Sequence, residues 1–180
     1  MATKNLKIGS VMPAFNLEGV DGNFYRNDFI KGKNATVIIF SCNHCPYVQA
    51  YENRIIEIQN KFSGRGVAVT AINSNDEIKY PDDSFGEMKI RAKLKNYNFP
   101  YLRDEDQSSA RAFDATHTPE IFLFDSESRL AYHGKIDDNW KEHEKVKSKY
   151  LENAIEELLE GKVISVPETF SIGCTIKWKS

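Results

Sequence analysis

The sequence predicts an α/β fold with a central mixed β-sheet, helices on both of its faces and a β-hairpin at the N-terminus. Three observations predict it. The apolar runs 35–40 and 67–72 lack the alternation of half-exposed strands, so both faces of each should be buried. Between them, apolar residues recur at helical spacing from Cys45 to Phe62. Strand, helix and strand in this order form a βαβ unit with parallel strands and a right-handed crossover.

The other elements follow from local pattern and turn chemistry. Residues 13–17 alternate apolar and polar side chains, and residues 24–25 supply the returning strand of a hairpin. Gly22 between them can adopt the positive φ of a turn. The remaining expected elements are a helical turn at 27–30, helices at 84–97, 107–113 and 146–160, an extended piece at 99–102 and antiparallel strands at 120–124 and 129–134.

One domain should cover residues 1–180, because a chain of this length can bury one sizeable core. Residues 1–13 lead into it, and residues 161–180 form a C-terminal tail. Within the tail, residues 171–178 alternate and could form either a terminal strand or a strap over the sheet.

The composition is that of an ordinary soluble globular protein, with 41% hydrophobic and 28% charged residues. A net charge of -2 gives no reason to expect nucleic acid or an anionic membrane as a partner. No apolar run approaches the roughly 18 to 20 residues of a membrane span. Residues 1–7 lack an apolar segment of signal-peptide length. We therefore expect a cytoplasmic protein, or a mature form whose signal has been removed.

Cys42 and Cys45 form a C-x-x-C motif where a buried strand passes into a helix. At a helix N-terminus the first cysteine should meet free backbone N–H groups and the positive end of the helix dipole. Both stabilise a thiolate and lower its pKa from about 8.5 to roughly 3.5–7.5. A protonated His44 would lower it further and make the pair more oxidising. We therefore expect Cys42 to attack a substrate disulfide and Cys45 to resolve the mixed disulfide, with no cofactor.

A C-x-x-C motif can also be half of a zinc site. The second half is missing, because the chain holds only Cys174 and four histidines as further ligands of this kind. The position of the motif between strand and helix favours redox chemistry over metal binding. We therefore assign no metal to the site.

The segment 8–15, the turn 21–23, the C-x-x-C motif and Thr118-Pro119 together resemble the thioredoxin superfamily. Within it the chain is similar to the redoxin or AhpC/TSA branch, which includes peroxiredoxin-like proteins and TlpA-type thiol-disulfide oxidoreductases. The resemblance covers most of residues 8–160 and implies a thioredoxin-like fold and a redox-active disulfide. It also implies a cis Pro119, with the backbone of Thr118 beside Cys42, where it can pair with a substrate strand. The implied partners are a protein or small-molecule disulfide and a thiol reductant or oxidant system.

The chain departs from this family in several ways. Ser41 stands where thioredoxins carry tryptophan, and the preceding strand lacks their buried acid. The proton acceptor for Cys45 is therefore left open, with Glu120 as a candidate. Copper-delivery proteins of the same fold use a cysteine pair and a distant histidine, so a copper- or zinc-binding metallochaperone is a further alternative. Their C-x-x-x-C spacing is longer than the spacing here.

A peroxiredoxin-like, antioxidant thiol peroxidase is another alternative. Cys45-Pro46 matches the end of the peroxiredoxin motif T-x-x-C-P, but Cys42 replaces the threonine that orients peroxide. The thiolate-stabilising arginine of that family would be Arg103 or Arg111.

Three further features have open roles. Cys174 has three alternative interpretations. In order of preference, it is a small buried hydrophobe, a third redox cysteine that reaches the Cys42–Cys45 site, or a metal ligand. His117 precedes Thr118 and could tune the cysteines, although an exposed loop histidine is the commoner case. Tyr47 and Trp140 could line a substrate groove, although packing is the commoner role for each.

Overall fold

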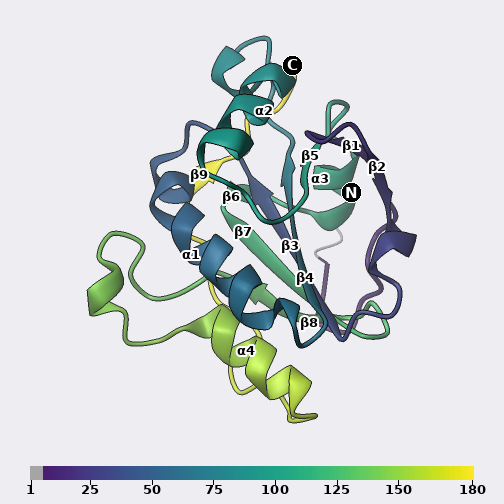
Figure 1. Ribbon diagram of the computed structural model, residues 1–180, viewed down its shortest axis with the longest axis vertical. Coiled ribbons are helices and arrows are strands. Elements are labelled where there is room, and N and C mark those ends of the chain that lie inside the picture. Colours follow the sequence, from purple (N-terminus) through teal and green to yellow (C-terminus); the bar gives the residue numbers. More distant parts are fainter. Residues whose placement is uncertain (1–5) are drawn as a thin grey trace.

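The computed structural model describes residues 6–180, so the expectations for residues 1–5 lie outside the described part. Its strands are β1 (Asn16–Gly19), β2 (Phe24–Arg26), β3 (Ala35–Ser41), β4 (Val67–Asn73), β5 (Tyr101–Arg103), β6 (His117–Thr118), β7 (Glu120–Asp125), β8 (Leu130–Gly134) and β9 (Cys174–Thr175). Within the described residues, seven of them form one sheet in the order β2-β1-β5-β4-β3-β7-β8, and β6 pairs with β9 (Figure 1).

The two central strands confirm the βαβ unit. β3 and β4 are parallel, with Val37 opposite Val69, and all seven residues of β3 are buried. On its other side β3 pairs antiparallel with β7, where Val37 lies opposite Leu123. The sheet is therefore mixed, and β3 delivers its C-terminal residues to the middle of one sheet edge.

The helices are α1 (Pro46–Ser63), α2 (Phe85–Leu94), α3 (Ser108–Phe113) and α4 (Tyr150–Leu159), with short 3-10 turns η1 (Asn27–Ile30), η2 (Pro81–Asp83) and η3 (His143–Lys145). α1, α2 and α4 pack on one face of the sheet through a core that includes Ile55, Met88 and Ile155. α3 packs on the opposite face, where Phe113 joins Phe122. Helices on both faces of a mixed sheet confirm the expected fold class (Figure 1).

The main difference from the expected elements is the start of the last helix. The pattern predicts a helix from residue 146, but α4 begins at Tyr150. The preceding residues are held in a loop by Asp138, whose N–H donates to the Ser148 carbonyl at 3.1 Å. The Asp138 carboxylate in turn accepts from the N–H of Lys147 at 2.9 Å. Backbone groups committed to this loop cannot begin a helix.

The C-terminal tail forms a short strand, β9, within a longer extended segment. We call this segment, residues 169–177, the strap. Before β9, the N–H of Thr169 donates to the His133 carbonyl at 3.0 Å. After β9, Ile176 is buried, and the N–H of Lys177 donates to the Asn75 side chain at 2.9 Å. The strap therefore runs from the end of β8 to the loop after β4, and hydrogen bonds hold it on both sides of β9.

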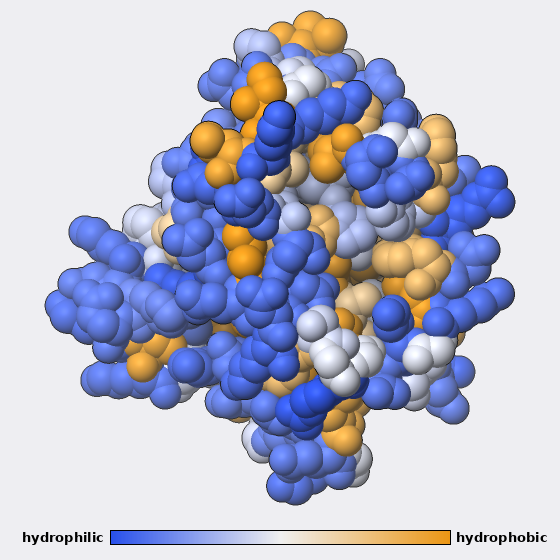
Figure 2. Space-filling view, in the orientation of Figure 1, coloured by the Kyte–Doolittle hydropathy of each residue, from blue (hydrophilic) through white to orange (hydrophobic). Residues whose placement is uncertain are grey.

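In residues 6–180, none of the helices combines the length and the apolar character that crossing a bilayer requires. The face of the molecule seen in Figure 2 is largely hydrophilic, with hydrophobic side chains in scattered small groups. Scattered apolar groups of this kind are normal on a globular protein.

Candidate active site

The C-x-x-C segment joins the end of β3 to the start of α1. β3 ends at Ser41 and α1 begins at Pro46, so Cys45 is the capping residue of the helix and Cys42 lies earlier, in the loop. Pro46 favours this start, because proline presets φ for the first helical position and has no N–H that needs a partner. The expectation that Cys42 occupies the helix N-terminus is therefore wrong, since Cys45 occupies it.

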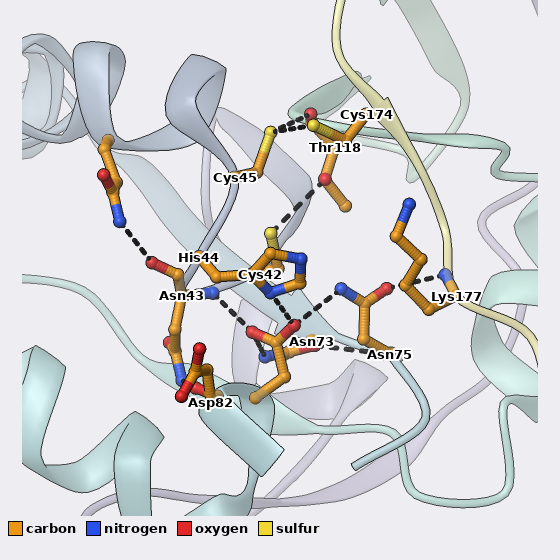
Figure 3. Close-up of polar contacts among 12 residues, drawn as sticks. Cys42, Asn43, His44, Cys45, Asn73, Asn75, Asp82, Thr118, Cys174 and Lys177 are labelled. Carbon is orange, nitrogen blue, oxygen red and sulfur yellow. Dashed lines mark hydrogen bonds and ion pairs between the residues drawn. The ribbon is translucent and has the colours of Figure 1, made fainter. Parts of the chain in front are cut away.

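Cys45 is the central member of a cluster that contains all three cysteines. Its Sγ lies 2.9 Å from the Sγ of Cys174 and 3.3 Å from the carbonyl oxygen of Thr118 (Figure 3). Cys45 is fully buried, Cys42 is 1% exposed and Cys174 is half-buried. Cys174 therefore lies in the same cluster, where it is half-buried and packs against Cys42, Cys45 and Val48.

Cys45 lies in surroundings that stabilise a thiolate. The hydrogen bond from the Cys42 thiol is the largest influence on the pKa of Cys45, which falls to about 4 although burial opposes the change. The Cys174 thiol and the N–H groups of Val48 and Cys174 act in the same direction. A protonated Cys45 would donate to Thr118, whereas a thiolate accepts from all of these donors. The arrangement therefore favours the thiolate at Cys45.

Cys42 is held in the opposite protonation state. Its pKa is raised, first by the hydrogen bond that its thiol makes to Cys45, then by burial and by the negative charge of Asp83. Its Sγ also lies 3.5 Å from the Oγ1 of Thr118. These influences favour the protonated form of Cys42, whereas the sequence predicts a thiolate there.

Thr118 contacts both members of the C-x-x-C pair from the facing strand. Its hydroxyl meets Cys42 and its carbonyl oxygen meets Cys45. The Thr118-Pro119 peptide bond is cis, as the family resemblance implied. The two residues that the sequence singled out on this side therefore face the cysteines.

A buried carboxylate that sequence reasoning missed lies under the C-x-x-C turn. Asp83, in η2, has no exposed surface. It accepts from the Asn43 N–H at 2.6 Å, from the Asn73 amide at 3.2 Å and from the Asn75 amide at 2.8 Å. The polar residues 73–83, which follow β4, were the sequence signal for a buried polar group at this site. β3 and β4 are parallel, so both end at the same edge of the sheet, and the loop after β4 lies beside Cys42.

His44 points to this carboxylate. Its Nδ1 lies 2.5 Å from the Oδ2 of Asp83, and the ring stacks on Tyr80 with centroids 5.8 Å apart. Any positive charge on His44 is therefore offset directly by Asp83. The expectation that a protonated His44 lowers the pKa of a cysteine stays a prediction, and the contact with Asp83 weakens its basis.

Glu120 is occupied elsewhere. It accepts from the N–H groups of Thr116 and His117, at 2.7 and 2.9 Å, and pairs with His133 at 2.7 Å. Burial raises the pKa of Glu120, but these hydrogen bonds outweigh it and the pKa is lowered overall. Glu120 therefore binds the backbone before β7, and the contacts do not support it as the proton acceptor for Cys45.

The remaining residues whose roles the sequence left undecided are His117, Tyr47 and Trp140. His117 contacts the Thr116 hydroxyl through Nδ1 at 2.7 Å. Tyr47 packs against the cysteine cluster and against Trp140, with ring centroids 4.4 Å apart. These contacts support packing for Tyr47 and Trp140.

The expected metal set of Cys42, Cys45 and a distant histidine is not among the groupings of residues 6–180. The ligand atoms that converge there, within 4.8 Å of one another, belong to Cys42, His44 and Asp83. His44 and Asp83 contact each other directly rather than across an ion, and both Asp83 oxygens already accept amide N–H groups. The arrangement fits a hydrogen-bonded carboxylate better than a metal centre.

Comparisons with known proteins identify the relatives of this chain. The AhpC/TSA family model matches residues 8–133. An uncharacterized conserved protein from Geobacillus kaustophilus is 40% identical, with a TM-score of 0.92 over 98% of this chain and 94% of that one. A hypothetical protein from Sinorhizobium meliloti 1021 is 34% identical, with a TM-score of 0.92 over 98% of this chain and 97% of that one.

More distant structures share the fold. The thioredoxin domain of a thiol-disulfide oxidoreductase from Bacteroides vulgatus is 18% identical, with a TM-score of 0.62 over 72% of this chain and 89% of that one. At this identity the likeness establishes a thioredoxin-like fold and nothing finer. No match was found among curated proteins.

Proposed function

The chain belongs to the AhpC/TSA family, and from this premise we propose that it is a thiol-disulfide oxidoreductase that works through Cys42 and Cys45. The observation that carries the proposal is the cysteine cluster at the start of α1, where Thr118 contacts both Cys42 and Cys45 and the surroundings favour a thiolate at Cys45 and a thiol at Cys42. A thiolate is the form of cysteine that attacks a disulfide, and a low thiol pKa makes it a good leaving group.

The exchange follows from these protonation states. The Cys45 thiolate attacks a substrate disulfide, forms a mixed disulfide with one half and releases the other half as a thiolate. Cys42 then loses its proton and attacks the Cys45 sulfur, which forms the Cys42–Cys45 disulfide and releases the second half of the substrate. Asp83 lies beside Cys42 and is the carboxylate best situated to influence this proton. The reaction runs in either direction, so the partner is a disulfide substrate or a thiol reductant.

Peroxide reduction is the second candidate, because Cys45-Pro46 at a helix start matches part of the peroxiredoxin motif. Among residues 6–180, the arginine that would stabilise the peroxide-reducing thiolate is not found beside Cys45. Arg103 contacts the Asn73 carbonyl and Glu77, and Arg111 binds Asp106 and Gln107. Neither arginine is among the partners of Cys45. Peroxide consumption that depends on Cys45 would favour this second candidate.

The proposal is tested with a small disulfide. The reduced protein is incubated with glutathione disulfide, and free thiols are counted after rapid alkylation. We expect a protein disulfide that includes Cys45, and we expect Cys45→Ser to abolish it. A Cys45→Ser variant that still forms a disulfide at the wild-type rate, or a wild type that forms none, would overturn the proposal. A cytoplasmic location, where thiols are kept reduced, remains part of the proposal.

A further inference from the structure

The strand edge beside the cysteines is occupied by the chain itself. β9 pairs antiparallel with β6, with Cys174 opposite Thr118 and Thr175 opposite His117. The family resemblance assigns the backbone of Thr118 to pairing with a substrate strand. The C-terminal strap therefore lies where an extended polypeptide would pair, and it brings its own cysteine to the position that a substrate cysteine would take.

The fit of the strap is close enough to require glycine. A Cβ added to Gly173 would lie 2.1 Å from the carbonyl oxygen of Thr118 and 2.7 Å from its carbonyl carbon. Both are backbone atoms and cannot turn away as a flexible side chain can. Any side chain at residue 173 must therefore push the strap away from β6.

With the strap in place, the three cysteine sulfurs differ in their exposure to solvent. Cys42 and Cys45 are 1% and 0% exposed, whereas Cys174 is half-buried. The Sγ atoms of Cys45 and Cys174 lie 2.9 Å apart, less than about 1 Å beyond the length of a disulfide bond. Burial and the hydrogen bond with Cys45 raise the pKa of Cys174 to about 11, and the positive charge of Lys177 opposes this rise. With the strap in place, an incoming reagent meets Cys174 first.

We propose that Cys174 is the sulfur at which low-molecular-weight anionic thiols and disulfides react, while the strap excludes extended polypeptides from the Thr118 edge. The inference rests on the proposed thiol-disulfide exchange and names its substrate class. Cys174 is then a catalytic residue, because it contacts the small substrate and passes its disulfide to Cys45.

Each step balances. The Cys174 thiol gives up its proton and attacks a small disulfide, which forms a mixed disulfide and releases one small thiol that carries this proton. The Cys45 thiolate attacks the Cys174 sulfur, so the Cys45–Cys174 bond forms and the second small thiolate leaves. Cys42 then gives up its proton and attacks Cys45, which yields the Cys42–Cys45 disulfide and a Cys174 thiolate that takes up that proton. The small disulfide is reduced to one thiol and one thiolate, and the Cys42 thiol and the Cys45 thiolate are oxidised to a disulfide.

The first test maps disulfides in the wild-type protein. Samples are quenched by acid and alkylation at successive times after addition of glutathione disulfide, then digested and analysed by mass spectrometry. We expect glutathione on Cys174 and a Cys45–Cys174 cross-link before or together with Cys42–Cys45. A time course with glutathione only on Cys42 or Cys45, and no Cys45–Cys174 cross-link, would overturn the inference.

The second test separates the thiol from the strap. Cys174→Ser keeps the strap, and we expect oxidation by glutathione disulfide to slow by at least about tenfold, because the accessible sulfur is gone. Gly173→Ala keeps the thiol, and we expect a several-fold faster reduction of insulin, because the polypeptide edge is uncovered. Gly64→Ala is the matched control, since its Cβ would meet no atom within 4 Å, and both rates should stay at wild-type values.

The outcomes distinguish the two proposals. If the wild type forms a disulfide at Cys45 but Cys174→Ser reacts with glutathione disulfide at the wild-type rate, the inference fails and the proposed function stands. If the wild type forms no disulfide at all, the proposed function fails and the inference fails with it. A Gly173→Ala variant that is folded, as judged by its thermal midpoint, but reduces insulin no faster would contradict the exclusion of polypeptides.

Discussion

The imidazole of His44 lies against the buried carboxylate of Asp83, with Nδ1 2.5 Å from Oδ2. The same carboxylate accepts the N–H of Asn43, inside the C-x-x-C turn, and the amide of Asn75. Asn75 in turn accepts the N–H of Lys177 from the strap. One carboxylate thus connects the turn that carries Cys42 to the strap that carries Cys174.

Replacing Asp83 should change both stability and the Cys42 thiol. In Asp83→Asn the new amide faces donors that the carboxylate accepted, so we expect a loss of about 1–3 kcal/mol in the free energy of unfolding. The pKa of Cys42 should fall, because the nearby negative charge that raises it is gone. Urea unfolding measures the first effect, and the pH dependence of alkylation in a Cys45→Ser, Cys174→Ser background measures the second.

Asp82→Asn provides the control, because the Asp82 side chain is exposed and its hydrogen bond to Asn43 uses the backbone carbonyl. It should leave both quantities near the wild-type values. An Asp83→Asn variant with an unchanged or higher Cys42 pKa would contradict the electrostatic role of Asp83.

The reduced protein should gain stability as the pH rises through the acid and neutral range. The pKa of Cys45 is about 4 in the folded chain against an ordinary value of 9.0, so between these values the unfolded state binds more protons. Stability from this group is therefore full above about pH 9 and is lost as the pH falls toward 4. The raised pKa values of Cys42 and Cys174 act in the opposite sense only above about pH 9.

Chemical unfolding of reduced wild type and Cys45→Ser across this pH range checks the prediction. The difference in free energy of unfolding between them should grow with pH. A constant difference would mean that Cys45 is not a stabilised thiolate. Ultraviolet thiolate absorbance should titrate in the acid range in the wild type and should lose that transition in Cys45→Ser.

The Cys45 disulfide should be oxidising. Donors to the Cys45 thiolate stabilise the reduced form, and a stabilised reduced form raises the reduction potential. We therefore expect a potential above the value of about -270 mV for thioredoxin, toward the value of about -120 mV for DsbA. Equilibration with glutathione buffers of known ratio measures it. A potential at or below that of thioredoxin would contradict the thiolate assignment.

The fold and the site differ in how far the sequence predicts them. Buried strands and amphipathic helices are local patterns, so the β3–α1–β4 unit and the opposition of Thr118-Pro119 to the cysteines could be read from the chain. The helix begins at Pro46, later than the motif suggests, so Cys45 and not Cys42 is its capping residue. Asp83 was missed because its contacts to Asn43 and His44 depend on how a loop folds beneath another strand end.

Glu120 should matter for stability and not for redox potential. Its carboxylate accepts two backbone N–H groups and pairs with His133, so Glu120→Gln should lose about 1–3 kcal/mol in the free energy of unfolding. Because the pKa of Glu120 is lowered in the folded chain, its stabilisation is present above the ordinary glutamate range and is lost as the pH falls below it. A shift in the Cys45 potential in Glu120→Gln would instead restore Glu120 as a participant in proton transfer.

The buried pair of Arg54 and Asp137 should be the most sensitive ionic contact near the site. Arg54 bonds Asp137 at 2.7 Å and also holds the carbonyl oxygens of Asn139 and Trp140. Arg54→Met leaves the Asp137 carboxylate, 5% exposed, without its cation. We expect a loss of about 3–5 kcal/mol in the free energy of unfolding, because an uncompensated buried charge remains.

Arg65→Met is the matched control for this prediction. Arg65 pairs with Glu156 at 2.6 Å, but both side chains are partly exposed to solvent, so its loss should cost less than about 1 kcal/mol. Equilibrium urea unfolding of both variants makes the comparison. Because Arg54 fixes the loop of Trp140, which packs against Tyr47 beside the cysteines, Arg54→Met should also raise the alkylation rate of Cys45. Equal losses in the two variants would contradict the assignment of Arg54 as the buried anchor of that loop.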